Sequence, residues 1–289
     1  MYDILIRMHN TTEHIYRQKI NKVIDYVSTN LHKPLSLDMI ANQIHVSQRQ
    51  LLRIMRTALN ESLSAYVARQ RVERAVMYMQ TEELNLTTIA AMVGYDNPQS
   101  FSKAFRKHFG ISPKAYLDML YNHLETYAKC HGNGQSNLYS EIHEEDDLEL
   151  VYIRIIGKYG EDKPYETAWN KLVCFIEKNS VLSDKTRFIG ISFDDPNVTC
   201  LDRCRFYACA STEKKIAPSG EFGTIQIRKG KYAVYTLKGS YAGLQELYNV
   251  ISLDSKHVER HGLAFEEYIN NPLDTDEAEL LTKIFIPIK

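Results

Sequence analysis

The sequence predicts a multi-domain protein, with an all-α double helix-turn-helix region followed by an α+β region of two strand-helix-strand-strand repeats. In roughly the first 120 residues, apolar side chains recur at helical spacing between short turns. From Leu148 onward the apolar side chains alternate instead, which is typical of strands. The length of 289 residues is enough for two domains of this kind.

The clearer helix-turn-helix copy spans 89–113. A short apolar helix precedes Gly94, where left-handed backbone costs least. Asn97-Pro98 then opens a second helix, because asparagine caps free amides and proline suits the first helical position. Gly110 ends this helix. Its predicted buried stripe consists of Phe101, Ala104, Phe105 and Phe109. The alternative is an ordinary amphipathic surface helix.

A looser copy precedes it, with Ser36 as the expected cap of its first helix and 43–46 as its turn. Ser47 and Gln50 fit a capping box at the start of its second helix. His45 stands where the other copy has Gly94. The expected inner stripe is Leu51, Ile54, Met55 and Ala58. A plain helical hairpin is the alternative here.

A single long helix over 63–80 is expected to separate the copies. At about 1.5 Å per residue it would span roughly 26 Å. A rigid spacer of that size could hold two recognition helices about one DNA turn apart, roughly 34 Å. One chain could then occupy two successive segments of the major groove.

Charge is unevenly distributed along a chain whose net charge is only −1. Residues 1–121 carry a net charge of +5, and residues 122–147 carry −5. The positive excess therefore falls on the helix-turn-helix region, as binding to phosphates requires. The acidic run 144–147 is expected to be a solvated domain edge. A second interpretation is that it competes with phosphate for the basic face.

The predicted boundaries follow from these shifts in pattern and charge. They are an N-terminal extension (1–16), a DNA-binding domain (17–121), a flexible acidic linker (122–147) and a C-terminal domain (148–289). The linker includes two glycines among polar residues at 129–137, a composition typical of flexible segments.

Several functional classes are disfavoured by the sequence. No apolar run approaches the roughly 20 residues of a membrane span, and no signal-peptide pattern opens the chain. The five cysteines fit reduced thiols in a cytoplasm, and the Cys200-x3-Cys204-x4-Cys209 spacing is a poor match to a metal site. Because no nucleophile–base pair or phosphate loop is evident, we expect no catalytic residues, no cofactor and no enzymatic activity.

The C-terminal domain is expected to hold two repeats side by side with a cleft where they meet. Gly157-x-Tyr159 and Gly239-x-Tyr241 occupy equivalent places, which suggests an internal duplication. One alternating strand is expected to begin over 148–154. The other expected strands are 188–193, 205–209, 223–228, 232–238, 266–268 and 283–287, and the expected helices are 167–178 and 244–253.

Residues 17–121 closely resemble the AraC/XylS family of transcription regulators. The resemblance is carried by Ala90-x3-Gly94-Tyr95, Ser100-Phe101-Ser102-Lys103-x-Phe105-Arg106-Lys107-x-Phe109-Gly110-x-Ser112-Pro113-x-x-Tyr116, Ala41-x5-Ser47-x3-Leu51-x-Arg53 and Tyr66-x4-Arg71-x3-Ala75. It implies that each copy inserts one recognition helix into the major groove. The positions that it implies at the DNA are Arg49, Leu52, Arg53, Arg56, Pro98, Gln99, Ser100, Ser102, Lys103, Arg106 and Lys107.

These positions differ in what they can do on DNA. Arg53 could read guanine bidentately and Gln99 could read adenine. Leu52 and Pro98 have no side-chain donor, so any role there is apolar or steric. Others will only hold phosphate. Because Arg49 and Arg53 both lie in the first copy, we expect that copy to carry most base specificity while the second chiefly anchors.

Residues 148–289 resemble the GyrI-like effector-binding domain. The matching pieces are Gly157-x-Tyr159-x9-Trp169, Gly190-Ile191-x-x-Asp194-Asp195-Pro196, Gly230-x-Tyr232-Ala233-Val234, Glu266-x-Tyr268 and Ile286-Pro287. The resemblance implies a carboxylate among aromatic rings, suited to a cationic, apolar ligand. The candidates are Glu266, Trp169, Tyr165 and Tyr268. Alternatively, Glu266 is a surface strand residue and Trp169 belongs to the core.

The family often has a Trp-Leu pair after the second helix, whereas this chain has His257-Val258 near that place, so one wall of the site is expected to differ. The combined architecture resembles regulators of the Rob type. It implies a cytoplasmic, sequence-specific activator that binds double-stranded DNA and RNA polymerase and senses a small molecule. The alternatives for the C-terminal domain are a hydrolase, with Glu266 activating water, or a protein-interaction or sequestration module.

Overall fold

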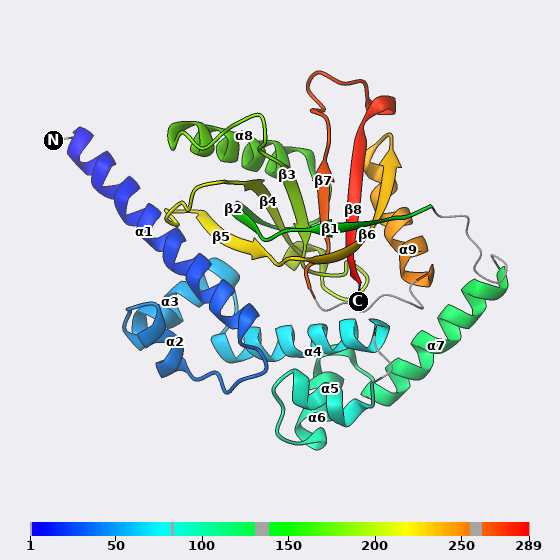
Figure 1. Cartoon of the computed structure of the whole chain (residues 1–289). Coiled ribbons are helices and arrows are strands. Elements are labelled where there is room, and N and C mark those ends of the chain that lie inside the picture. The colour runs from blue at the N-terminus through cyan, green and yellow to red at the C-terminus, as the bar shows by residue number, and fades with distance from the viewer. Residues whose placement is uncertain (1, 82–83, 131–138, 255–261, 289) are drawn as a thin grey trace. The chain divides into compact units, whose positions relative to one another are not determined.

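The computed structural model describes residues 2–81, 84–130, 139–254 and 262–288. The chain divides into two compact units, Met1–Asn122 with Pro218–Gly223, and His123–Ala217 with Thr224–Lys289 (Figure 1). A helical N-terminal region and a sheet-rich C-terminal region are therefore confirmed. In the described part of the chain, no helix has the length and apolar character needed to cross a membrane.

The helical unit contains both expected helix-turn-helix copies. The first copy is formed by α2 and α3, the second by α5 and α6, and α4 separates them. The helices are α1 (Tyr2–Thr29), α2 (Leu37–Gln43), α3 (Gln48–Leu59), α4 (Leu63–Thr81), α5 (Leu86–Met92), α6 (Pro98–Phe109) and α7 (Pro113–Cys130). Since α1 begins at Tyr2, it runs through the boundary expected at residue 16.

Local capping fixes where the helices begin. The hydroxyl of Ser36 accepts a hydrogen bond from the backbone N–H of Met39. Ser47 and Gln50 form the predicted reciprocal capping box at the start of α3. Asn97 caps α6, with Pro98 in its first turn. Each cap satisfies backbone donors that the helix itself leaves free.

The turns within the two copies share one hydrogen-bond pattern. In the first, the N–H of Val46 donates to the carbonyl of Ala41 at 3.0 Å, and in the second Tyr95 donates to Ala90 at 2.9 Å. The residue before each donor is left-handed, with φ 54° at His45 and 85° at Gly94. The equivalence of these two positions in the sequence is therefore confirmed.

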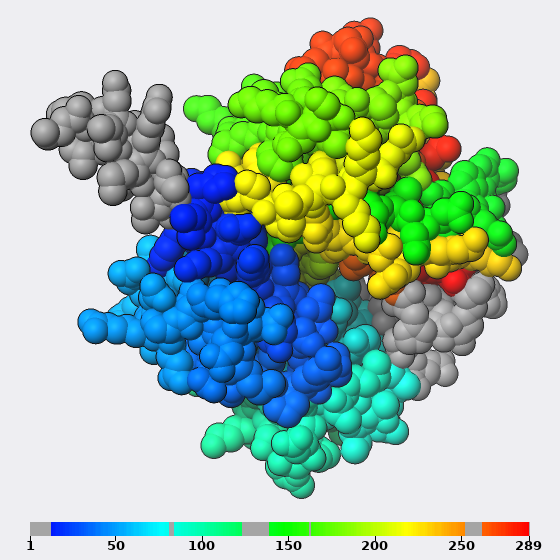
Figure 2. All heavy atoms as spheres, turned by 60° about the vertical axis from the view of Figure 1, so that its left-hand side comes forward, coloured from blue at the N-terminus to red at the C-terminus, as the bar shows by residue number. Residues whose placement is uncertain are grey.

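Each copy packs an apolar stripe against its neighbours. Leu51, Ile54 and Met55 of α3 are buried, whereas Ala58 is exposed, so its assignment to the stripe is wrong. Leu59, half-buried, packs against this core instead, one position further along the last turn. The blue atoms of residues 13–59, which include the later part of α1 and all of α2 and α3, lie against one another in Figure 2.

The second unit is built on one sheet of eight strands, in the order β1-β6-β8-β7-β3-β4-β2-β5. The elements β2-α8-β3-β4 and β6-α9-β7-β8 each follow a strand-helix-strand-strand order. The elements are β1 (Glu141–Glu145), β2 (Leu148–Ile156), α8 (Asp162–Lys178), β3 (Phe188–Ser192), β4 (Arg205–Ser211), β5 (Phe222–Ile227), β6 (Gly230–Lys238), α9 (Leu244–Asp254), β7 (Phe265–Tyr268) and β8 (Leu281–Ile288). Their origin by duplication stays a prediction.

The acidic segment 122–147, for which the sequence predicts a flexible linker, includes parts of two regular elements. Its first residues belong to α7, and β1 pairs antiparallel with β6 at the edge of the sheet. Glu145 of β1 forms an ion pair with Arg187 at 2.5 Å. Charged residues are common on edge strands, where they discourage pairing with other chains, and they hide the apolar alternation that identifies a strand. The glycines at 132 and 134 lie outside the described residues.

Candidate DNA-binding face and carboxylate cluster

The three arginines of α3 expected at the DNA are all exposed. Arg49, Arg53 and Arg56 lie away from the stripe that buries Leu51 in the core. Within the described part of the chain, none of their guanidinium groups makes a hydrogen bond or ion pair with another residue. Leu52, on the same exposed side, is 47% exposed. This side of α3 is therefore a basic surface around one apolar side chain.

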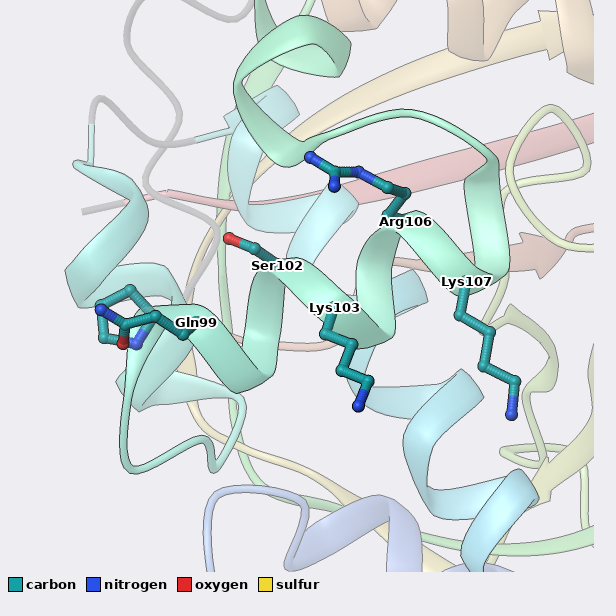
Figure 3. A pocket seen from close by; sticks show the side chains of 6 residues that line it. Gln99, Ser102, Lys103, Arg106 and Lys107 are labelled. Atoms are coloured by element: carbon teal, nitrogen blue, oxygen red, sulfur yellow. The ribbon is translucent and has the colours of Figure 1, made fainter.

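The outer side of α6 is a second basic surface. Six of the expected DNA-contacting residues line a shallow hollow there, namely Pro98, Gln99, Ser102, Lys103, Arg106 and Lys107. Figure 3 shows Lys103 and Lys107 pointing to one side of the helix axis, and Ser102 and Arg106 to the other. Ser100 is exposed, whereas Ser102 is half-buried and reaches the surface less fully than expected.

The side of α6 opposite the basic surface packs into an aromatic core. Phe101 and Phe105 are buried with ring centroids 5.6 Å apart, and the ring of Phe105 lies 5.6 Å from that of Tyr116 in α7. Phe109 is only half-buried, although its ring lies 4.6 Å from that of Phe105. The expected stripe is therefore present, and it fixes which side of α6 faces solvent.

In the second unit, Glu266 lies at the centre of the sheet. It stands on β7, opposite Gly190 of β3, where the two strand-helix-strand-strand halves pair with each other. A Cβ atom on Gly190 would lie 2.4 Å from the Tyr268 hydroxyl and 2.8 Å from Phe206. Glycine is therefore required for this close approach around the carboxylate.

The carboxylate of Glu266 is 3% exposed and accepts hydrogen bonds from three hydroxyl groups. Tyr268 donates to Oε2 at 2.6 Å, and Tyr248 of α9 donates to Oε1 at 3.0 Å. Ser192 donates a longer bond of 3.5 Å to Oε1. Within the described residues, no lysine, arginine or histidine forms an ion pair with this carboxylate. The expectation that Glu266 could be a surface residue is therefore wrong.

Burial dominates the protonation of this group. It raises the pKa of Glu266 because a charged carboxylate loses hydration, while the three hydroxyl donors oppose that change. The phenol of Tyr268 has its pKa raised by burial and by the neighbouring carboxylate. A buried carboxylate with neutral donors and no cation is costly unless it is protonated or meets a positive ligand.

Further aromatic rings pack near Tyr268, whose hydroxyl donates to the carboxylate. The ring of Trp169 on α8 meets that of Tyr268 edge-on at 5.5 Å, and Tyr241 does so at 5.4 Å. Tyr165 packs on Phe206 at 4.9 Å, and the charge of Glu266 contributes to the raised pKa of its phenol, after burial. We call Glu266, Ser192, Tyr165, Trp169, Tyr241, Tyr248 and Tyr268 the carboxylate cluster.

The structure thus brings together the four residues expected at the effector site, which come from α8 and β7. The sequence reasoning missed Ser192, Tyr241 and Tyr248. Tyr248 lies within the predicted helix 244–253, but nothing local indicates that it reaches β7. His257-Val258, where a different wall was expected, lies outside the described residues. Cys204 and Cys209 are buried and Cys200 is exposed, and the described residues include no cluster of metal-ligand type.

Two family models match this chain. Residues 140–289 match the GyrI-like small molecule binding domain, which is about half of the chain, and residues 40–119 match a helix-turn-helix domain. The first match begins one residue before β1, a strand that lies in the segment predicted to be a linker.

The curated relatives match the helical half. SoxS of Salmonella typhimurium is 30% identical over 105 residues, which are 36% of this chain and 98% of SoxS. AarP of Providencia stuartii is 35% identical over 107 residues, covering 36% of this chain and 79% of AarP. YkgA of Escherichia coli is 31% identical over 107 residues, but the match covers only 45% of YkgA.

Among solved structures, an AraC-type regulator from Chromobacterium violaceum is 29% identical over 35% of this chain and 91% of its own, with a TM-score of 0.34. A structure of an EcmrR–DNA complex aligns with 88% of this chain and 98% of its own at 14% identity and a TM-score of 0.44.

Two helix-turn-helix copies ahead of a small-molecule binding domain define a class of transcription regulators. The chain belongs to the AraC/XylS family, in the Rob-type architecture that carries a GyrI-like domain after the DNA-binding half.

Proposed function

We propose that the chain is a sequence-specific DNA-binding regulator that places α3 and α6 in two successive segments of the major groove. The observation that carries this proposal is the pair of exposed basic surfaces, each on the second helix of a helix-turn-helix copy. Three guanidinium groups on α3 are unengaged within the described residues and can approach base edges and phosphates. The outer surface of α6 offers lysine, arginine and amide groups.

The two surfaces are proposed to have unequal roles. Arg49 and Arg53 supply α3 with donors that suit guanine, whereas Pro98 occupies the first turn of α6 without any donor. Base specificity then resides mainly in α3, while α6 contributes chiefly phosphate contacts. The regulator is proposed to act as an activator that also contacts RNA polymerase, by analogy with AarP, which is named a transcriptional activator.

Binding to DNA is tested with duplexes that the wild-type protein selects from a random library. Arg53→Ala is expected to weaken binding by about 1–3 kcal/mol, or roughly 5- to 150-fold, and to relax the preference at one base pair. Lys107→Ala should weaken binding to all duplexes alike. Lys185→Ala, which removes an exposed lysine of the second unit, is the matched control and should change nothing. Unchanged affinity and preference in Arg53→Ala would contradict the assignment of α3.

We propose that the carboxylate cluster binds a small, apolar cation. The carboxylate has no positive partner within the described residues, so a cation would supply the missing charge. Trp169 and Tyr241 contact the ring of Tyr268, which donates to this carboxylate, and aromatic rings attract cations when water is excluded. A single carboxylate with three hydroxyl neighbours suits an organic cation better than a metal ion, which needs several ligands.

Tetraphenylphosphonium is a suitable probe, with neutral triphenylphosphine oxide for comparison. Trp169 is the only tryptophan of the chain, so its fluorescence reports binding at the cluster. Glu266→Gln should weaken binding of the cation at least about 30-fold, equivalent to about 2 kcal/mol, because the buried charge is lost. Glu246→Gln, at an exposed position of α9, should leave affinity unchanged. Equal affinity for the cation and its neutral analogue would refute the proposal.

A cation that binds here regulates transcription only if it changes affinity for DNA or polymerase. Titrating the selected duplex with and without saturating tetraphenylphosphonium measures that coupling directly. A tenfold change in affinity would correspond to about 1.4 kcal/mol of coupling free energy.

A further inference from the structure

Arg71 lies near the middle of the spacer helix α4 and contacts the first helix-turn-helix copy. Its Nε donates to the carbonyl of Leu31 at 3.0 Å, and its Nη2 donates to that of Lys33 at 2.7 Å. Both acceptors belong to the short segment that joins α1 to α2. The guanidinium therefore holds the backbone that enters the first copy.

The same guanidinium contacts the turn of the second copy. Its Cζ atom lies 5.5 Å from the ring centroid of Tyr95, which follows Gly94 in the turn between α5 and α6. The ring of Tyr95 lies 5.6 Å from that of Phe101, a buried residue of α6. A continuous chain of contacts thus leads from the Leu31 carbonyl through Arg71 to the second recognition helix.

Gly94 also contributes to this junction, by which we mean the contacts of Arg71 with the 31–33 segment and with the turn at Gly94-Tyr95. A Cβ atom at this position would lie 2.3 Å from the Leu31 carbonyl oxygen and 2.7 Å from Nη2 of Arg71. The turn of one copy and the entry segment of the other therefore approach each other closely, with the guanidinium beside both of them. Such a junction fixes both the distance and the angle between the copies, because neither backbone can move without breaking a contact.

The chemistry of Arg71 points to positioning rather than to stability alone. The side chain is half-buried, and desolvation lowers the pKa of its guanidinium. Within the described residues it forms no ion pair, and its donors go to neutral carbonyl groups. The charge of Asp96 opposes this change in pKa, but the hydrogen bonds of the guanidinium go to carbonyl groups and not to that carboxylate. Partial burial of a charge in this way is a poor source of stability, whereas a planar fork that bridges two carbonyls fixes geometry well.

We propose that Arg71 is a positioning residue for bipartite DNA recognition, which sets the spacing between α3 and α6 by bridging the 31–33 segment and the turn at Gly94-Tyr95. This inference rests on the proposed binding of two successive groove segments. On B-DNA, one extra base pair moves the second segment by about 3.4 Å and rotates it by roughly 35°. If the junction is rigid, α3 and α6 cannot both follow the shifted segments, and the insertion costs much affinity for DNA. If the junction is loosened, both helices can adjust, and the insertion costs less affinity.

The test compares two duplexes, the one selected by the wild-type protein and the same duplex with one base pair inserted between its two segments. For the wild-type protein we expect the insertion to weaken binding at least tenfold. Arg71→Met keeps the apolar stem but removes the bridge, so the penalty for the insertion should shrink at least threefold. Arg71→Lys, which can reach one carbonyl but not both, should give an intermediate penalty.

Lys185→Met is the matched control, because it removes a positive charge in the same way at an exposed position of the second unit. The penalty for the insertion should equal that of the wild-type protein.

A parallel loss of affinity for both duplexes, with the penalty unchanged, would overturn the inference and leave Arg71 with a structural role only. If Arg71→Met fails to fold, as judged by circular dichroism, Arg71→Lys carries the same comparison. A wild-type protein that selects no bipartite sequence would overturn the proposed function itself. If the wild-type protein does select a bipartite sequence and the Arg71 variants show the same penalty, only the inference about Arg71 is overturned.

Discussion

Replacing Glu266 by glutamine is expected to change how stability of the C-terminal unit depends on pH, even without ligand. The carboxylate is 3% exposed and has three hydroxyl donors but no cationic partner within the described residues, so its pKa is raised on folding. A group with a raised folded pKa contributes its full stability below the unfolded pKa, about 4.3 for glutamate. That contribution is lost as the pH rises from the unfolded pKa to the folded pKa. Above the folded pKa, this group no longer changes the free energy of unfolding with pH.

The magnitude follows from linkage. Between the unfolded and folded pKa values, the wild-type protein should lose up to about 1.4 kcal/mol of unfolding free energy per pH unit relative to Glu266→Gln. The amide of glutamine cannot accept from all three hydroxyls, which adds a constant penalty of about 1–3 kcal/mol to the variant. The slope of the difference against pH is therefore the informative quantity.

Urea unfolding followed by the fluorescence of Trp169 reports this unit selectively, because the chain has one tryptophan and it lies beside Tyr268. Wild type, Glu266→Gln and the exposed control Glu246→Gln would be compared from pH 4 to 8. The control should follow the wild-type curve. A wild-type–minus–variant difference that is flat over this range, or that favours the wild type as the pH rises, would refute the reasoning. Either result would mean that the folded site holds the charged carboxylate at least as easily as water does.

The helical unit provides three further tests. Gly94→Ala should reduce the free energy of unfolding by more than Gly110→Ala, because both residues are left-handed but only Gly94 has backbone within 4 Å of a new Cβ. Equal losses in urea unfolding would contradict the close approach at Gly94. Phe105→Ala should cost about 3–5 kcal/mol, measured by circular dichroism, and a loss below 1 kcal/mol would mean that this ring is not a core anchor. Lys107→Ala should reduce the slope of log affinity against log salt by about 0.9, as expected for one lost phosphate contact, whereas an unchanged slope would place Lys107 away from the DNA backbone.

Features decided by neighbouring residues were predicted well from the sequence. The caps at Ser36, Ser47 and Asn97 and the left-handed positions at His45 and Gly94 depend on a few adjacent side chains. The buried side of α6 follows from its repeated phenylalanines. Ala58 was misassigned because a small side chain at the end of a helix carries little information about which way it faces.

Features decided by distant contacts were harder to predict. Tyr248 reaches Glu266 because α9 packs on the same side of the sheet as the glutamate, which depends on the strand order rather than on local pattern. The role of Arg71 emerges only when the 31–33 segment and the turn at Gly94 are seen to meet. β1 was hidden because an edge strand needs few apolar residues.

The pairing of β1 with β6 has a practical consequence for the choice of protein fragments. β1 precedes the first strand-helix-strand-strand half, yet it pairs with β6 of the second half along 141–145. A fragment starting at residue 148 would bare the backbone of β6 and remove the Glu145 partner of Arg187. Exposed strand backbone invites association with other chains, so such a fragment should precipitate or dimerise, whereas one starting at residue 139 retains its own edge.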